Sequence, residues 1–276
     1  MSTLSMERLD ELLSGVSEQY SPRLLAAVRF AVEAGQQTLQ RFCHAGLQVE
    51  KKNDRSPVTA ADKDAELLLR ERIQASFPDD SLVGEEFDNV EGSSEYRWIV
   101  DPIDGTKSFI CGVPLYATLV GIERDGESSI GVIYIPALGE LIFAEVGSGA
   151  SYLKGDDALA TPQVSSTTSL DESCFVTSQV STFYEVDRTS QYLALEKATY
   201  ITRTWGDAYG YLLVATGRAE LMVDAIMNVW DAAAILPIMV ESGGTFTDWN
   251  GTATIHGGEG IGTNGHVLQE TLTLIQ

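Results

Sequence analysis

Cysteine, histidine and basic side chains are all scarce in this chain, and each shortage excludes a class of protein. The 276 residues include three cysteines and three histidines. Cys43, Cys111 and Cys174 show neither a CxxC pair nor the spacing of a zinc site, so we expect free thiols in a reducing cytoplasm, with Cys111 packed inside the protein. The histidines occur in no recognisable motif, so a histidine nucleophile is not expected.

Positive charge is also in short supply. The chain has 18 lysines and arginines against 40 aspartates and glutamates, for a formal net charge of −22. Nucleic acids and acidic membranes bind basic patches, so neither is expected as a partner. No apolar run approaches the ~20 residues that a membrane span needs. Residues 1–20 contain acids and lack the apolar core of a secretory signal, so we expect a cytoplasmic protein.

The most informative stretch that is present is WIVDPIDGTKSF, residues 98–109. Its apolar start predicts a buried strand, which leads into Asp101 and Asp104 at a tight turn. Two carboxylates this close repel each other unless a cation lies between them. Mg²⁺ is the simplest such cation because it prefers oxygen ligands, and the backbone carbonyl of Ile103 offers a further oxygen. Taken alone, the same residues also fit an ordinary Asp-Gly turn.

Two further acidic sites lie at the expected ends of other elements. Glu85 follows Leu82-Val83-Gly84, which indicates a strand end, and Asp231 lies in the first turn of an apolar helical stretch. By itself Glu85 fits a solvated loop, and Asp231 fits a helix cap or a partner of the helix dipole. Three acidic sites at element ends are, however, what a phosphatase with several metal ions requires.

Helix-like and strand-like patterns alternate along the chain without internal repeats. The spacing of apolar residues predicts helices over residues 22–43 and 61–77, followed by strands at 81–84, 97–101, 115–123, 129–135, 140–146 and 150–153. After residue 165 we expect strands at 173–177 and 220–223, helices at 188–198 and 207–216, and a last short strand and helix at the C-terminus. A helix from Trp230 to about Ser242 is predicted to be kinked by Pro237. This order indicates layers of sheets and helices.

Together these motifs make the chain similar to the inositol monophosphatase family, a Mg²⁺-dependent and often Li⁺-sensitive class of phosphatases. The resemblance covers roughly residues 24–268. It rests on PVTAAD at 57–62, GEE at 84–86, DPIDGTKSF at 101–109, WD at 230–231 and ESGG at 241–244. Lysine, serine and phenylalanine after Asp-Gly-Thr, the run GDAYGY at 206–211, and Val223-Asp224 ahead of Asn228 are typical of the histidinol-phosphate phosphatase branch. Inositol monophosphatases usually carry Thr-Asn-Phe after Asp-Gly-Thr.

The resemblance implies an α/β/α/β/α sandwich with the metal site between an N-terminal half, residues 1–165, and a C-terminal half, residues 166–276. It also implies two or three Mg²⁺ ions. Asp101 would bridge metals, Glu85 and the carbonyl of Ile103 would complete one site, and Asp104 and Asp231 would hold the second. A homodimer is common among members of the family and is expected here.

A catalytic group is implied beside the metals. Thr106 can orient the attacking water through its hydroxyl, cap the short helix that follows it, or do both. Asp62 can cap the helix that begins near it. The resemblance implies that Asp62 also hydrogen-bonds Thr106 and completes a water-activating unit with Glu85. Lys51 or Lys52 fits a contact with the site, although exposed stems are the simpler interpretation.

Substrate contacts are expected from both halves of the chain. The backbone N–H groups of Gly105 and Thr106 lie where a turn leads into a helix, a position that favours phosphate. Gly206 and Asp207 open another expected helix and fit either a substrate contact or an ordinary helix start. The resemblance places a carboxylate that binds the substrate at Asp224.

We therefore predict a Mg²⁺-dependent phosphomonoesterase that hydrolyses L-histidinol phosphate to L-histidinol and phosphate in histidine biosynthesis, by in-line attack of a metal-bound water. An inositol monophosphatase or a broad sugar-phosphate phosphatase is the alternative. A regulatory binding protein on a phosphatase fold is a hypothesis of another class, but it has no need to keep mutually repelling carboxylates. The acidic surplus weakly favours a substrate with an ammonium group, which histidinol phosphate carries and inositol phosphate lacks.

Overall fold

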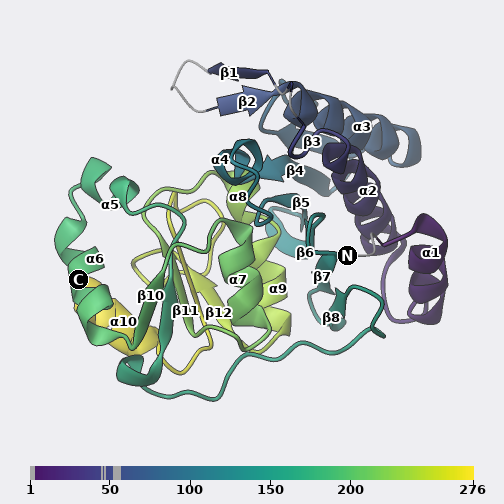
Figure 1. Ribbon diagram of the computed structural model, residues 1–276. Helices are drawn as coiled ribbons and strands as arrows, with labels where there is room; N and C mark the ends of the chain where they lie inside the picture. Colours follow the sequence, from purple (N-terminus) through teal and green to yellow (C-terminus); the bar gives the residue numbers. More distant parts are fainter. Residues whose placement is uncertain (1–3, 45, 47, 52–56) are drawn as a thin grey trace.

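The structure is a computed structural model of the chain (Figure 1), which describes residues 4–44, 46, 48–51 and 57–276. Lys52 and the side chain of Lys51 lie outside the described part, so their predicted contact with the site is not addressed. A short antiparallel ladder of β1 (Val49–Lys51) and β2 (Pro57–Thr59) lies at one edge of the molecule (Figure 1).

A six-stranded sheet carries the first half of the fold. Its strands lie side by side in chain order: β3 (Ser81–Gly84), β4 (Tyr96–Asp104), β5 (Ala117–Arg124), β6 (Glu127–Ile135), β7 (Glu140–Glu145) and β8 (Gly149–Lys154). The first pair is parallel, and the later pairs are antiparallel. The parallel start places the C-terminal ends of β3 and β4 at the same edge of the sheet, which brings Glu85 toward Asp101.

Both faces of this sheet are buried under helices. α2 (Pro22–Leu39) and α3 (Ala60–Ser76) cover one face, and α1 (Met6–Gly15) packs against α2. Trp98 and Val100 of β4 point toward these helices, whereas Ile99 between them belongs to a second core on the other face. Successive residues of a strand point to opposite faces, so burial of both faces explains the continuous apolar run before Asp101.

A five-stranded sheet carries the second half, in the order β10 (Ile201–Arg203), β9 (Cys174–Val176), β11 (Leu221–Asp224), β13 (Gly260–Thr263) and β12 (Thr245–Thr247). Between the two sheets lie α7 (Ala208–Ala215), α8 (Val229–Ala232) and α9 (Ile235–Glu241) (Figure 1). The outer face of the five-stranded sheet is covered by α5 (Ser181–Glu185), α6 (Thr189–Ala198) and α10 (Leu268–Ile275). This arrangement of layers confirms the expected α/β/α/β/α sandwich.

The core between the two sheets contains residues from both sides of residue 165. The division into halves at that residue therefore stays a prediction. In the described part of the chain, no helix combines the length and the apolar character that crossing a membrane requires.

The helix predicted from Trp230 to Ser242 is divided into two short helices, α8 and α9, at Ala233 and Ala234. Pro237 explains the break because it has no N–H to donate to the carbonyl of Ala233, four residues earlier. The hydroxyl of Ser128 donates to that carbonyl instead, at 3.3 Å. The expected kink exists, but it lies one turn before the proline.

Two glycines let this divided helix approach the first sheet closely. A Cβ added at Gly121 of β5 would lie 2.5 Å from the Cβ of Ala233, and one at Gly131 of β6 would lie 2.0 Å from the carbonyl oxygen of Ala234. Any other residue would push the helix away. The close contact seats α8 against β4 and β5, and with it Asp231.

Candidate active site

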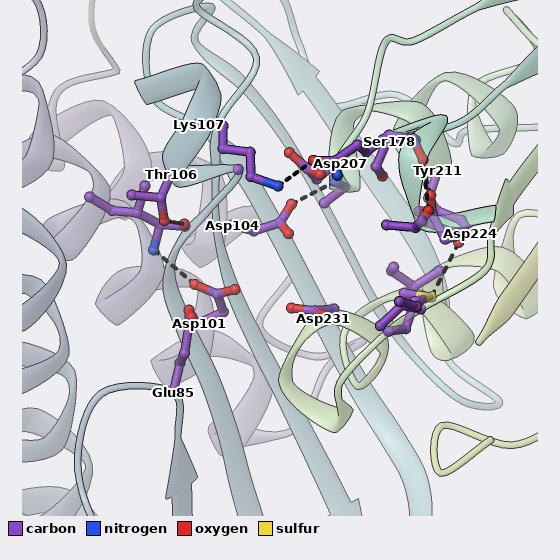
Figure 2. A pocket seen from close by; sticks show the side chains of 18 of the residues that line it. Glu85, Asp101, Asp104, Thr106, Lys107, Ser178, Asp207, Tyr211, Asp224 and Asp231 are labelled. Atoms are coloured by element: carbon purple, nitrogen blue, oxygen red, sulfur yellow. Dashed lines mark hydrogen bonds between the residues drawn. The ribbon is translucent and has the colours of Figure 1, made fainter. Parts of the chain in front are cut away.

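A pocket of about 220 Å³ opens where β4, the start of α7, the end of β11 and α8 meet (Figure 2). Six acidic side chains line it: Glu85, Asp101, Asp104, Asp207, Asp224 and Asp231. Lys107 is the single basic side chain in the lining that the described residues form. The excess of negative charge inside one pocket demands a cation to balance it.

Three of these carboxylates form a compact group. Asp101 and Asp104 end β4 and are 2% and 6% exposed, and Asp231 comes from α8. One oxygen from each lies within 4.8 Å of the others, and the three side chains face one another across the pocket (Figure 2). Glu85 lines the same pocket without belonging to this group, and so does Ile103, whose carbonyl was the predicted backbone ligand.

Burial and repulsion from neighbouring carboxylates raise the pKa of each carboxyl in the group. Burial raises the pKa of Asp101 well above its ordinary value, and the charges of Glu85 and Asp104 raise it further. The pKa of Asp104 is raised in the same way, by burial and then by the charges of Asp207 and Asp231. Burial raises the pKa of Asp231 to about 7, against a backbone hydrogen bond that lowers it.

Hydrogen bonds fix how the three carboxylates point. Asp101 accepts the N–H of Ile103 at 3.0 Å, and Asp104 accepts the N–H of Ala208 at 2.6 Å. Asp231 accepts the N–H of Asn228 at 2.7 Å, within a capping box at the start of α8. Asp231 therefore caps the helix, as the alternative interpretation predicted, and also belongs to the acidic group. An all-oxygen set of this kind fits a hard divalent cation such as Mg²⁺, and not a soft metal.

The turn from β4 into the short helix α4 (Thr106–Ile110) depends on Gly105. This residue has φ of +84°, which favours glycine. A Cβ added to it would also lie 2.6 Å from Oδ2 of Asp207. The turn therefore brings Asp207, at the start of α7, against the acidic motif of β4, although the two are about a hundred residues apart in the sequence.

Thr106 and Asp62 are in contact, as the resemblance implied. The hydroxyl of Thr106 lies 3.1 Å from Oδ1 of Asp62 and 3.2 Å from the carbonyl of Ile103. Asp62 is fully buried behind Thr106, outside the pocket lining, and its other oxygen accepts the N–H and hydroxyl of Thr59 at 2.8 and 2.6 Å. Asp62 thus closes the capping box of α3 and also holds Thr106. Burial raises its pKa, against these hydrogen bonds.

The far wall of the pocket is built around Asp224, at the end of β11. Its carboxylate is 5% exposed and accepts the N–H of Ser178 at 3.0 Å and the hydroxyl of Tyr211 at 3.1 Å. Burial raises its pKa to about 6. Burial also raises the pKa of Asp207, although Lys107 opposes the shift. Each of these acids favours a positively charged or hydroxyl-bearing ligand at this wall.

Some residues fall outside their expected places, and others were not foreseen. Gly206 does not line the pocket, because it packs on Ser178, whose Cα would lie 2.3 Å from an added Cβ. Lys107, which served only as a signature of the branch, lines the pocket and donates to the side chain of Gln179. Tyr211 also lines the pocket, although its side chain is 1% exposed and its sequence position gives no sign of a role beyond the core. The packing predicted for Cys111 is wrong, because this cysteine follows α4 at the surface.

The chain is similar to known proteins in both sequence and structure. The model of the inositol monophosphatase family matches residues 19–275. The chain is 45% identical over 241 residues to a histidinol-phosphatase from Chlorobaculum parvum, which covers 87% of this chain and 91% of that protein. It is 34% identical over 250 residues to a histidinol-phosphatase from Mycobacterium tuberculosis, which covers 91% and 96%. Among solved structures, the extragenic suppressor protein suhB from Bartonella henselae has a TM-score of 0.85 at 27% identity and covers 93% of this chain and 99% of that one.

Proposed function

Because the chain belongs to the inositol monophosphatase family and is a phosphomonoesterase, we propose that it hydrolyses L-histidinol phosphate to L-histidinol and phosphate with Mg²⁺. The observation that carries the proposal is the group of Asp101, Asp104 and Asp231, of which the first two are buried and the third is partly buried, and which each offer one oxygen within 4.8 Å of the others. Such a group is costly without a cation and useful with one.

We assign the metal ligands to Asp101, Asp104, Asp231, Glu85 and the carbonyl of Ile103, which all line the pocket. Two or three Mg²⁺ ions, when bound, would neutralise the phosphoryl oxygens and lower the pKa of the attacking water. The carboxylates keep their orientation through the backbone hydrogen bonds described above, so little reorganisation is needed when a cation arrives.

Thr106 is assigned to the orientation of water. Its hydroxyl donates to Asp62, so its lone pairs remain available to accept a hydrogen bond from a water in the pocket. Asp62 in turn is fixed by Thr59, which limits how far Thr106 can rotate. Glu85 lies near the same space and is assigned to the water-activating unit with them. The N–H groups of Gly105 and Thr106 are assigned to the phosphate.

The wall formed by Asp207 and Asp224 supports a cationic substrate. Histidinol phosphate carries an ammonium group and a titratable imidazole, and both are attracted by nearby carboxylates. In the part of the chain that the structure describes, Lys107 is the one basic side chain of the lining that opposes this attraction. Lys107 is placed to attract the phosphate end. Inositol 1-phosphate is the second candidate, because Asp224 with the hydroxyl of Tyr211 also forms a donor and acceptor pair suited to a ring hydroxyl.

The test is phosphate release from L-histidinol phosphate and inositol 1-phosphate, side by side, with Mg²⁺. We expect kcat/KM to favour histidinol phosphate by roughly 10²-fold or more, equivalent to ~2.7 kcal/mol of transition-state binding. Asp224→Asn should weaken hydrolysis of histidinol phosphate and change that of p-nitrophenyl phosphate, which has no ammonium group, much less. A preference of wild type for inositol phosphate would contradict this substrate assignment. So would an equal loss of activity on histidinol phosphate and p-nitrophenyl phosphate in Asp224→Asn. The expected homodimer stays a prediction, which light scattering of the purified protein would test.

A further inference from the structure

A buried ion pair lies behind the pocket, on α3. Arg70 lies one turn after Glu66, and its guanidinium contacts the carboxylate at 2.8 Å. Glu66 is fully buried and Arg70 is 7% exposed. Neither residue lines the pocket. A buried pair gains little stability over apolar residues of similar size, so its contacts with other segments are what distinguish it.

The pair holds the segment that carries Glu85. The N–H of Glu86 donates to Oε2 of Glu66 at 2.7 Å. Nη2 and Nη1 of Arg70 donate to the carbonyls of Phe87 and Asp88, both at 2.9 Å. Each of the three residues that follow Glu85 therefore has one backbone group bound by a member of the pair.

The segment needs such support because it belongs to no helix or strand. β3 ends at Gly84, and residues 85–87 form bends that are followed by an irregular residue 88, without a sheet ladder. A Cβ added to Gly84 would lie 2.1 Å from Oε1 of Glu66, so the carboxylate sits directly against the end of the strand. The ion pair supplies the backbone partners that a neighbouring strand would otherwise supply.

The same face of α3 also reaches the other side of the site. Asp62, Glu66 and Arg70 are four residues apart and therefore share one face of the helix. Asp62 holds Thr106, and the pair holds the segment of Glu85. We propose that Glu66 and Arg70 are positioning residues, which fix Glu85 at the metal site and, together with Asp62, make α3 the element that aligns both parts. This inference rests on the proposed role of Glu85 as a ligand.

The expected consequence is a change in metal affinity with little change in chemistry. Partners that orient a metal ligand typically contribute 10- to 100-fold to metal affinity. A loosened segment would require more Mg²⁺ to order Glu85, while enzyme saturated with Mg²⁺ would recover its activity. A merely structural role would lower stability without this split.

The experiment compares Arg70→Lys and Glu66→Gln with Arg72→Lys. Lysine keeps the charge at position 70 but loses the fork that binds two carbonyls. Arg72 is the matched control, because it lies on the same helix and makes an equally forked pair with Glu33 of α2, at 3.0 and 2.6 Å, away from the segment. Glu66→Gln keeps the shape of the side chain and carries the test if Arg70→Lys does not fold.

Two measurements follow on each variant. Hydrogen exchange of metal-free protein should accelerate at residues 86–88 in Arg70→Lys and Glu66→Gln, but not in Arg72→Lys. The Mg²⁺ concentration for half-maximal activity, and the dissociation constant for Mn²⁺ measured by EPR without substrate, should rise about 10-fold or more in the first two variants. Their kcat at saturating Mg²⁺ should stay within about 3-fold of wild type.

Wild-type exchange and wild-type Mn²⁺ affinity in folded Arg70→Lys and Glu66→Gln would overturn the positioning role. Equal effects in Arg72→Lys would overturn it too, because they would reflect general loss of stability. Glu85→Gln separates this inference from the proposed function. Weak metal binding in Glu85→Gln, with none in the pair variants, rejects the positioning role alone. Wild-type metal binding in Glu85→Gln would instead reject the assignment of Glu85 as a metal ligand.

Discussion

Asp231→Asn is expected to stabilise the metal-free protein although it removes a proposed ligand. The pKa of Asp231 rises from an ordinary value of 3.8 to about 7 in the folded chain. An acid whose pKa is higher in the folded than in the unfolded chain destabilises the fold when it is ionised, and below its unfolded pKa this penalty is absent. The penalty grows as the pH rises and is complete above about pH 7. At 1.36 kcal/mol per pH unit, the shift sets an upper bound of about 4 kcal/mol.

The expected gain is smaller than this bound because Asp101 and Asp104 share the repulsion and take up protons in place of Asp231. We expect about 1–3 kcal/mol in EDTA at pH 8, or a Tm roughly 2–8 °C above wild type. The amide oxygen of asparagine can still accept the N–H of Asn228, so the capping contact survives. At pH 4 the gain should disappear, and added Mg²⁺ should stabilise wild type far more than the variant.

Thermal unfolding of both proteins at pH 8 and pH 4, with EDTA or with Mg²⁺, measures these differences in stability. Asp80→Asn is the matched control with the opposite sign. Asp80 is also buried, but hydrogen bonds from Arg23, Ser94 and Trp98 outweigh its burial and lower its pKa. Its replacement should destabilise the protein at pH 8. An Asp231→Asn protein no more stable than wild type in EDTA at pH 8, or equally stabilised at pH 4, would refute the reasoning.

Two further substitutions test the geometry around the group. Gly131→Ala places a Cβ 2.0 Å from the carbonyl oxygen of Ala234, so α9 must move. We expect about 1–3 kcal/mol lower stability in urea unfolding and reduced phosphate release through displacement of Asp231, and wild-type values in both would contradict the close-approach argument. Thr106→Val keeps the shape of the side chain but removes the hydroxyl, so kcat should fall about 10²-fold while Thr106→Ser keeps most activity. Equal activity of the valine and serine variants would count against the orientation of water by Thr106.

The sequence indicates the acidic residues because each lies at one end of an apolar element. Asp101 and Asp104 end a strand, and Asp231 lies in the first turn of a helix. Local spacing alone brings Asp101 and Asp104 together, but the same spacing fits an ordinary Asp-Gly turn as well as a metal site. Asp231 is more than a hundred residues away, and no local pattern could place it within 4.8 Å of them. The resemblance to a family, and not periodicity, joined the three residues and supplied the layered fold.

Other parts of the site depend on tertiary contacts that leave no local trace. Glu66 looks like any charged residue of a helix, yet it is fully buried under the segment of Glu85. Tyr211 looks like core and contacts Asp224 across the pocket wall. The break before α9 was expected at Pro237, but its position depends on a carbonyl that Ser128 satisfies from a neighbouring strand. Such roles are set by which surfaces meet, and spacing in the sequence does not encode them.

Phosphate release by Asp104→Asn across a Mg²⁺ titration, measured beside wild type, tests the metal site most directly. Asparagine preserves the shape of the side chain and the contact with the N–H of Ala208, so the fold should remain nearly intact by circular dichroism. We expect turnover to fall by about 10³-fold or more at ordinary Mg²⁺. Wild-type turnover in a folded Asp104→Asn protein at ordinary Mg²⁺ would contradict the assignment of the metal site.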